Sequence, residues 1–311
     1  MMHTTSPLTL VAAAETCLAV NELFYSNAPE LVRNLRAPNN LREALCQGSP
    51  DERNKWKNAR CEEFENLDSN GAWTPCTLPK GGKMLGTKTV FKIKSKSDGT
   101  LDRHKAGEVA QGFRQIEGLD CTETFLAKCL IVTVRTLIAL ATHHGWRMLH
   151  FDVTGAYLYG KLEEGLCARV PEGCLECCRT HNKQMHSHLI RLERGGNQVC
   201  LKLQKSIYGL KQAGRVWNKT FETFLKTENL VKSAVNPCLY VNQEGGCEDH
   251  FAIALCVDDL LVVCGNTSKA KAKLENFKQN AAKHFKIQDL GDLQWFLGIK
   301  VDRLPNLILW Q

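Results

Sequence analysis

The sequence has no apolar run that approaches the roughly 18 residues needed to cross a membrane. A short apolar stretch, residues 8–14, lacks a basic leader and meets Glu15, so it is not typical of a signal peptide. There is no internal repeat, and the 15 cysteines do not form the regular ladder of a disulfide scaffold. We therefore expect an intracellular, cytoplasmic chain (with a nuclear location left open) whose cysteines stay reduced.

A strong charge of one sign is also absent. The formal net charge is +7, with 23% charged and 43% hydrophobic residues. This composition is typical of a globular protein and too weakly basic to mark a nucleic-acid-binding domain by itself, although it suits a polyanionic partner. With 311 residues, the chain can bury the core of one large domain or two.

Apolar periodicity predicts helices and strands that do not alternate regularly, which indicates an α+β fold. Residues 1–40 have weak periodicity and end in a linker, so we expect a poorly ordered segment before a folded domain over 41–304. Alternating apolar and basic residues over 90–94, followed by a turn signal, predict a hairpin with a lysine-rich face. The predicted helices cover residues 41–67 with a break at 49–50, 131–142, 213–225 and 268–285.

Two adjacent carboxylates, Asp258 and Asp259, separate two apolar runs so closely that they must lie at or beside a hairpin turn. Asp-Asp is poor turn chemistry, and adjacent carboxylates repel unless a cation neutralises them. Oxygen ligands suit Mg²⁺ or Mn²⁺. A solvated acidic turn is the alternative interpretation of this dipeptide.

A third carboxylate, Asp152, ends another apolar run. A single aspartate at a strand end is often only a cap. Three aspartates at the ends of neighbouring strands, however, suit a phosphoryl-transfer site with two metal ions. A phosphatase with a DxDxT motif is set aside, because Asp152-Val153-Thr154 lacks the second aspartate.

Short motifs resembling one known pattern occur in a fixed order along residues 41–304. They are Trp56 with Glu62-Glu63 and Leu67; Asn70-Gly71-Ala72-Trp73; Val90-Phe91-Lys92-Ile93-Lys94 with Asp98-Gly99; His104-Lys105-Ala106; Val109-Ala110-Gln111-Gly112-Phe113 with Gln115; Glu123-Thr124-Phe125; Phe151-Asp152-Val153-Thr154-Gly155-Ala156-Tyr157-Leu158; Leu162-Glu163-Glu164; Lys205-Ser206-Ile207-Tyr208-Gly209-Leu210-Lys211-Gln212-Ala213; Pro237-Cys238-Leu239-Tyr240; Val257-Asp258-Asp259; and Asp289-Leu290-Gly291 with Phe296-Leu297-Gly298-Ile299. Together they resemble the copia-type (Ty1/copia) retrotransposon reverse transcriptases, whose polymerase is part of a Pol polyprotein.

The resemblance implies the fingers and palm of a right-hand polymerase that extends a primer on an RNA or DNA template with deoxynucleoside triphosphates. It implies that Asp152, Asp258 and Asp259 are catalytic and hold two Mg²⁺ or Mn²⁺ ions. Tyr157 would stack under the deoxyribose and exclude a 2′-hydroxyl, although a core aromatic is the alternative. The other implied nucleotide-binding residues are Gln212, Gly209, Lys92, Arg103 and Lys105; each of the three cations, taken alone, also fits a solvated surface charge.

The sequence departs from the family pattern at several places. Gly107-Glu108 replaces the expected Arg-Leu, which we interpret as an anion at a phosphate contact. After Phe125 the residues resemble compensating frame slips, and residues 305–311 resemble a tail truncated before the thumb and ribonuclease H. Two functions therefore stay open: an active polymerase, or a decayed remnant that at most binds nucleic acid and shows little processive synthesis.

Residues 173–198 are polar and rich in cysteine and histidine, and we predict an irregular insertion there. Zinc requires four ligands, which a Cys-x₂-Cys pair and two histidines would supply. The histidine spacing is irregular, so a solvated loop is favoured over a zinc site. The oligomeric state has no signal in the sequence.

Overall fold

The computed structural model describes residues 35–96, 100–124, 129–243, 246–304 and 307–310. The chain forms two compact units, each built from two segments. Unit 1 combines residues 1–122 with 161–213, and unit 2 combines 123–160 with 214–311. Both contain helices and strands, which confirms the expected α+β class. None of the helices in the described ranges is long and apolar enough to cross a membrane.

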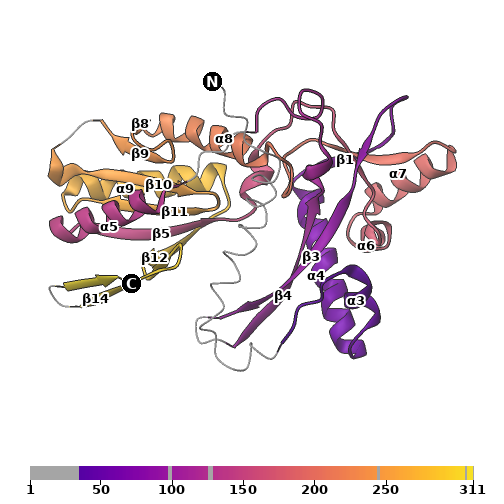
Figure 1. Cartoon of the computed structure of the whole chain (residues 1–311), viewed down its shortest axis with the longest axis horizontal. Helices are drawn as coiled ribbons and strands as arrows, with labels where there is room; N and C mark the ends of the chain where they lie inside the picture. The colour runs from indigo at the N-terminus through magenta and orange to yellow at the C-terminus, as the bar shows by residue number, and fades with distance from the viewer. Residues whose placement is uncertain (1–34, 97–99, 125–128, 244–245, 305–306, 311) are drawn as a thin grey trace, which may run out of the picture. The chain divides into compact units, whose positions relative to one another are not determined.

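Unit 1 contains four helices, a short 3₁₀ turn, a four-stranded sheet and a two-stranded ribbon in its described part. The sheet has the strand order β1-β7-β6-β2. The ribbon pairs β3 with β4 (Figure 1). The elements are α3 (Leu41–Cys46), α4 (Pro50–Ser69), β1 (Trp73–Thr77), β2 (Met84–Leu85), β3 (Thr87–Ser95), β4 (Leu101–Ala110), η1 (Gly112–Arg114), β6 (Cys167–Arg169), α6 (Cys174–His181), α7 (Lys183–Arg194) and β7 (Val199–Leu203).

The helix break predicted at 49–50 is confirmed, and its cause is a cap. The Ser49 hydroxyl accepts a hydrogen bond from the Glu52 amide at 3.2 Å, and Pro50 occupies the first turn of α4, where its missing N–H costs nothing. Trp56 on α4 is 2% exposed and packs edge-to-face on Phe91 of β3, with ring centroids 5.4 Å apart. This contact joins α4 to one face of the ribbon.

The predicted hairpin is also confirmed, since β3 and β4 pair antiparallel from Thr87↔Ala110 to Ser95↔Leu101. Its turn, residues 97–99, lies outside the described residues. Because side chains alternate along a strand, Phe91 and Ala106 face α4 while their neighbours face away.

The prediction of an irregular insertion over 173–198 is wrong. Helices α6 and α7 occupy most of it, and the Asn182 side chain caps α7 by accepting from the Met185 amide at 2.9 Å. The segment is polar in composition, but Met185 and Leu189 lie on one face of α7 and are buried. The prediction relied on composition and overlooked this apolar helix face.

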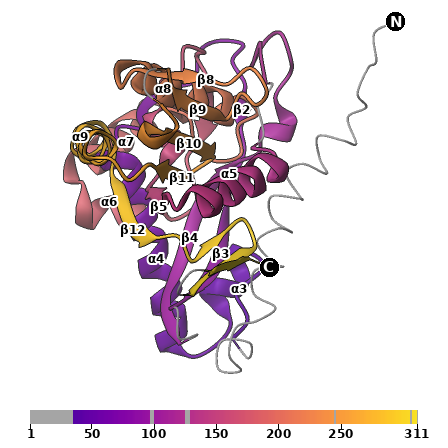
Figure 2. The same cartoon turned by 90° about the vertical axis from the view of Figure 1, so that its left-hand side faces the viewer.

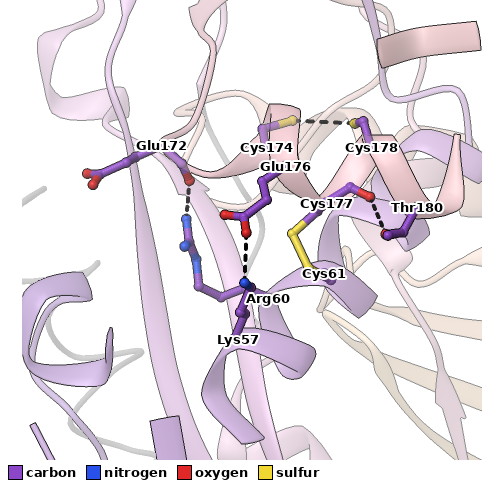
Figure 3. The surroundings of a disulfide bond; sticks show 9 residues. All are labelled: Lys57, Arg60, Cys61, Glu172, Cys174, Glu176, Cys177, Cys178 and Thr180. Carbon is purple, nitrogen blue, oxygen red and sulfur yellow. Dashed lines mark hydrogen bonds and ion pairs between the residues drawn. A yellow bond between two sulfur atoms is a disulfide. The ribbon is translucent and has the colours of Figure 1, made fainter. Parts of the chain in front are cut away.

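A disulfide between Cys61 and Cys177 ties α4 to α6 (Figure 3), with their Cα atoms 5.2 Å apart. The expectation that all cysteines stay reduced is therefore wrong for these two. The expectation came from the reducing environment inside cells, which says nothing about two cysteines 116 residues apart becoming neighbours in the fold. Lys57 and Glu176 form an ion pair beside the bridge at 2.8 Å.

Unit 2 is a six-stranded antiparallel sheet with the order β12-β5-β11-β10-β9-β8, followed by a small β13-β14-β15 sheet. Residues 305–311, predicted as a tail, contain strand β15, which pairs with β14. The elements are α5 (Ile131–His144), β5 (Arg147–Val153), η2 (Ala156–Tyr159), α8 (Ala213–Thr227), β8 (Leu230–Lys232), β9 (Leu239–Asn242), η3 (Cys247–Asp249), β10 (Phe251–Cys256), β11 (Asp259–Cys264), α9 (Ser268–His284), β12 (Ile287–Asp292), β13 (Trp295–Phe296), β14 (Ile299–Leu304) and β15 (Leu307–Trp310).

Helices cover both faces of this sheet (Figure 2). On one face, Phe221 of α8 and Phe277 of α9 pack in the same buried cluster as Phe151 of β5. On the other face, Ile138 of α5 packs in the same buried cluster as Met148. The central strands β10 and β11 are buried on both faces, which explains their continuous apolar sequence.

Candidate functional site

Strand register brings two of the three predicted aspartates together in unit 2. Strands β5 and β11 pair antiparallel, and Asp152 lies directly opposite Asp259. The Cα atoms of such partners are about 4.5–5.5 Å apart. Both side chains are on the α5 face of the sheet, because Met148 and His150 alternate with the buried residues of the other face.

The third aspartate, Asp258, lies in the turn between β10 and β11. Cys256 pairs with Asp259, so the two turn residues are Val257 and Asp258 rather than the two aspartates. The Asp258 carbonyl accepts a hydrogen bond from the Val153 amide at 2.8 Å, which ties the turn to the end of β5. All three aspartates therefore lie at one end of neighbouring strands.

Val257 adopts φ 60°, a left-handed conformation that β-branched residues rarely occupy. Such strain persists only where surrounding contacts impose it. The buried Trp217 indole donates a hydrogen bond to the Val257 carbonyl. Trp217 is thus one of the contacts that hold the turn.

The Asp152–Asp259 arrangement is electrostatically unfavourable by itself, since like charges directly opposite each other destabilise a sheet. The Asp259 side chain is 37% exposed, so an ion from solvent can reach it. Its Oδ1 is 2.9 Å from Nε2 of His150. Carboxylate oxygens are the ligands that Mg²⁺ or Mn²⁺, the ions expected from the sequence, prefer.

His150 was missed in the sequence. The available signal was strand alternation, which places residues 150 and 152 on one face of β5. The His150 ring also packs edge-to-face on Phe296, with centroids 5.4 Å apart. Because both contacts fix its orientation, His150 holds the Asp259 carboxylate in place.

Tyr157 lies in η2, the turn that follows β5. Its side chain is partly buried against the cluster under the sheet, next to Tyr159. The core-aromatic alternative and the sugar-contacting role are both compatible with this half-exposed position.

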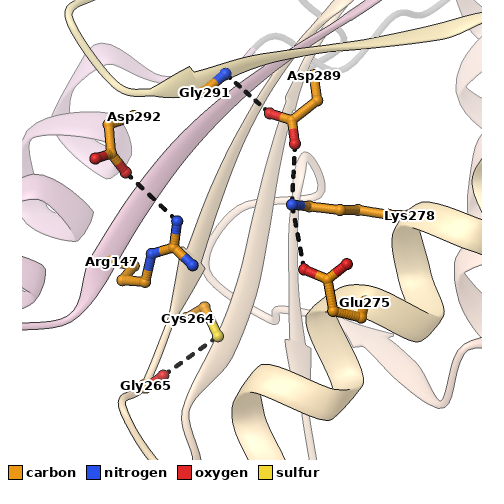
Figure 4. Close-up of polar contacts among 8 residues, drawn as sticks. All are labelled: Arg147, Cys264, Gly265, Glu275, Lys278, Asp289, Gly291 and Asp292. Atoms are coloured by element: carbon orange, nitrogen blue, oxygen red, sulfur yellow. Dashed lines mark hydrogen bonds and ion pairs between the residues drawn. The ribbon is translucent and has the colours of Figure 1, made fainter.

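A second set of polar contacts braces strand β12 (Figure 4). Asp289 accepts from the Gly291 amide at 2.9 Å and pairs with Lys278 of α9 at 2.9 Å. Gly291 has φ 79°, which glycine adopts without strain. This motif is structural, since it fixes a bulge in the strand next to Asp152.

The three predicted cations belong to unit 1 and share one face of the ribbon. Lys92 is the direct cross-strand partner of Lys105, and Lys94 is the partner of Arg103. This face is opposite to the one that packs on α4. Four cations on one face repel one another, so the ribbon favours an anionic partner.

Glu108 does not lie on that basic face, so interpreting it as an anion at a phosphate contact is wrong. It is 2% exposed, and the Thr89 hydroxyl donates to its carboxylate at 2.8 Å. Gly107 occupies the basic face instead. The departure from Arg-Leu therefore removes a cation at one position and buries an acid in place of a leucine at the next.

Burial also affects Glu63 on α4, which accepts a hydrogen bond from the Glu108 amide at 3.1 Å. Burial raises the pKa of Glu63 to about 7 and raises the pKa of Glu108 as well. An acid whose pKa is higher in the folded than in the unfolded state stabilises the fold. This stabilisation is complete at a pH below the unfolded-state pKa and is lost as the pH rises through the folded-state pKa.

We therefore expect the free energy of unfolding of unit 1 to fall between about pH 4.5 and 7, and Glu63→Gln to remove roughly 1–3 kcal/mol of that dependence. Amide hydrogen exchange of β3 and β4, corrected for intrinsic rates, measures this. The exposed neighbour variant Glu62→Gln is the control. Equal pH profiles for the two variants would contradict the assignment of this pH dependence to Glu63.

A protein-family model described as reverse transcriptase (RNA-dependent DNA polymerase) matches residues 70–309. The chain belongs to this reverse transcriptase family. It is 36% identical over 274 residues to a retrovirus-related Pol polyprotein from transposon TNT 1-94 of Nicotiana tabacum, and 32% identical over 277 residues to that from transposon RE1 of Arabidopsis thaliana. It is 27% identical over 193 residues to the Ty1-DR4 Gag-Pol polyprotein of Saccharomyces cerevisiae.

These alignments cover 88%, 89% and 61% of the chain but only 19%, 17% and 10% of the relatives. The chain thus spans about a fifth or less of the length of the polyproteins it matches. The copia-type resemblance seen in the motifs is confirmed.

The most distinctive motif of the family pattern, residues 205–213, packs on the end of the ribbon. A Cβ at Gly209 (φ 90°) would collide with the Ala110 carbonyl, and the Ala110 amide donates to the Tyr208 carbonyl at 2.8 Å. Gln212 is 1% exposed; its amide oxygen accepts from Gln115 at 3.0 Å. Gly209 and Gln212, both predicted to bind the nucleotide, therefore stabilise the local structure of unit 1.

Proposed function

We propose that this chain is the polymerase part of a copia-type Pol polyprotein and transfers deoxynucleotides to a primer on an RNA or DNA template. In this proposal unit 2 is the palm and unit 1 the fingers of a right-hand polymerase. The pairing of Asp152 with Asp259 across β5 and β11 is the observation that carries the proposal.

The aspartates would hold two Mg²⁺ or Mn²⁺ ions, which when bound lower the pKa of the primer hydroxyl and stabilise charge on the phosphates. Asp152 and Asp259 supply opposed carboxylates, and Asp258 adds a third from the turn. His150 keeps the Asp259 carboxylate in one orientation through its 2.9 Å contact. Carboxylate ligands that are already fixed need no rearrangement during the reaction. Such preorganisation is a large part of electrostatic catalysis.

The cations of the ribbon would bind a polyanion. Lys92, Arg103 and Lys105 share its open face, and a triphosphate or nucleic-acid backbone would neutralise them. Gly209 and Gln212 would act through backbone placement, because the Gln212 side chain is buried.

The second candidate is a remnant that binds nucleic acid without catalysis. Gly107 favours it, since the family pattern has an arginine there and the basic face loses one cation. Buried Glu108 favours it too, because burial of an acid in place of an apolar side chain costs stability.

Single-nucleotide primer extension separates these candidates. The purified chain is given a primed RNA template, one matching deoxynucleotide, and Mg²⁺ or Mn²⁺. We expect metal-dependent addition of one nucleotide. Binding of primer–template without any extension, in either metal, would support the remnant instead.

We expect Tyr157→Ala to admit ribonucleotides, because the half-exposed ring would no longer contact the sugar. The preference for deoxy- over ribonucleotides, measured as a ratio of kcat/KM, should fall at least about tenfold, which corresponds to roughly 1.4 kcal/mol. Tyr159→Ala is the control, since the Tyr159 hydroxyl accepts a hydrogen bond from the Lys286 amide at 2.6 Å and its ring packs edge-to-face on Phe285. An unchanged ratio for Tyr157→Ala would show that the ring only packs.

A further inference from the structure

Three cysteine thiols from three different strands meet on the sheet of unit 1. The Sγ atoms of Cys76, Cys167 and Cys200 all lie within 4.8 Å of one another, and those of Cys76 and Cys200 are 3.4 Å apart. Among the described residues, this is the cluster of metal-ligand side chains that the structure brings together.

Strand register explains the convergence. Cys76 of β1 is the direct partner of Cys200 of β7. Cys167 of β6 lies opposite Lys202, two residues further along β7 and therefore on the same face as Cys200. The backbone of three paired strands, rather than flexible loops, thus fixes the three sulfur positions.

The face that carries these thiols is otherwise polar. Its other members on the same strands are Thr74, Lys202 and Arg169, all exposed. The opposite face carries the buried apolar side chains, such as Trp73 and Leu201. The cysteines are therefore not simply members of the apolar core, and the half-buried Cys76 leaves solvent a route to the cluster.

We propose that Cys76, Cys167 and Cys200 form a three-thiolate site for a soft d¹⁰ metal ion of the zinc group, with a solvent molecule as fourth ligand. Zinc–sulfur bonds are about 2.3 Å, so two sulfurs on one tetrahedral ion are roughly 3.8 Å apart. The observed separations, 3.4 Å for one pair and at most 4.8 Å for the others, bracket that value. Thiolates prefer such ions to Mg²⁺, so this site would bind a different metal ion from the one proposed at the aspartates.

Binding would release three protons to solvent, one from each thiol, with no change of oxidation state. Burial raises the pKa of Cys167 and of Cys200, so both are thiols until an ion displaces their protons. The nearby Lys202 lowers the pKa of Cys167 and offsets the excess negative charge of three thiolates on a divalent ion. This site would clamp β1, β6 and β7 and stabilise unit 1, whatever the chain does with nucleotides.

The cysteines of 173–198 do not offer an equivalent site. Cys177 is bonded to Cys61, and Cys174 and Cys178 are two thiols on one helix with sulfurs 3.9 Å apart. Two ligands leave a zinc ion half coordinated. A zinc site in this segment, which the sequence already disfavoured, is not among the groups of metal-ligand side chains that the described residues form.

Titration of the full chain with Cd²⁺ under argon tests the proposal, followed by thiolate-to-metal charge-transfer absorption in the ultraviolet. We expect one ion to bind per chain with a three-thiolate band. Cys76→Ser should reduce the band by about a third and weaken binding at least about tenfold. Cys167→Ser should do the same, whereas Cys46→Ser, which removes an exposed free cysteine, should change neither.

Circular dichroism of each variant checks that the fold is retained; Cys76→Ser is the safer variant because its position is half-buried. Unchanged affinity and band intensity in both Cys76→Ser and Cys167→Ser would overturn the proposal. Mass spectrometry that finds a Cys76–Cys200 disulfide and no bound metal in the anaerobically isolated chain would overturn it as well. Primer extension is not a readout here, so failure of this site leaves the polymerase proposal untouched.

Discussion

The Asp259→Asn substitution is expected to lower metal-dependent nucleotide addition by at least roughly 10²–10³-fold, the cost of removing one preorganised charge-stabilising group. Asp259 lies opposite Asp152 and is half-open to solvent, so its carboxylate is placed to ligate an ion. Asparagine keeps the size and the contact with His150 but removes the charge. Single-turnover primer extension in Mg²⁺ and Mn²⁺ measures the effect.

Thermal unfolding gives a readout that does not depend on activity. In a chelator, Asp259→Asn should raise the Tm of unit 2, because it relieves repulsion between two opposed carboxylates. With Mn²⁺ in excess, the wild-type Tm should rise and the variant Tm should not, since an ion stabilises only the state that binds it.

The matched control is Asp292→Asn in the same unit. Asp292 forms an exposed ion pair with Arg147 at 3.7 Å, a kind of contact that contributes little. It should leave both primer extension and the metal-induced Tm shift unchanged. Equal metal-induced shifts in the wild type and Asp259→Asn would rule out this carboxylate as a ligand.

Much of unit 2 could be predicted from the sequence, because local signals and long-range pairing agree there. The apolar runs around Asp258-Asp259 do form the hairpin β10–β11, and helix α5 ends at Gly145 in the left-handed conformation with φ 65°. The convergence of Asp152 with Asp259 follows only from the pairing of β5 with β11. Sequence patterns predict strands, but they do not say which strands become neighbours.

The errors in unit 1 have the same origin. The side of the ribbon on which Glu108 lies depends on the register of β3 and β4, and a shift by one residue reverses it. The bridge between Cys61 and Cys177 and the cluster of Cys76, Cys167 and Cys200 join distant segments in the same way. The zinc alternative weighed from the sequence used cysteines that are close in sequence, whereas the fold brings together cysteines that are far apart.

The Trp217→Ala substitution is expected to have the largest effect on stability. Trp217 is 1% exposed and packs against Phe221, Phe285 and Tyr159, with ring centroids 5.1, 5.5 and 6.0 Å away. Removing a buried tryptophan leaves a cavity and typically costs about 3–5 kcal/mol. Urea unfolding of unit 2, followed by circular dichroism, measures the loss.

Trp217→Phe separates packing from the hydrogen bond to the turn. Phenylalanine keeps a ring in the cluster but cannot donate to the Val257 carbonyl, so the strained φ of 60° at Val257 loses one of its restraints. We expect a modest stability cost of roughly 1–2 kcal/mol, the usual penalty for an unpaired buried group. The rate of primer extension should fall by more than the loss of folded protein explains, because the turn carries Asp258 and sets the position of Asp259.

The same turn offers a rescue experiment. Val257→Gly removes the strain at a position where a two-residue turn favours glycine, and should restore stability to Trp217→Phe. If Trp217→Phe extends primers as well as the wild type, the indole N–H only satisfies the carbonyl and does not position the aspartates.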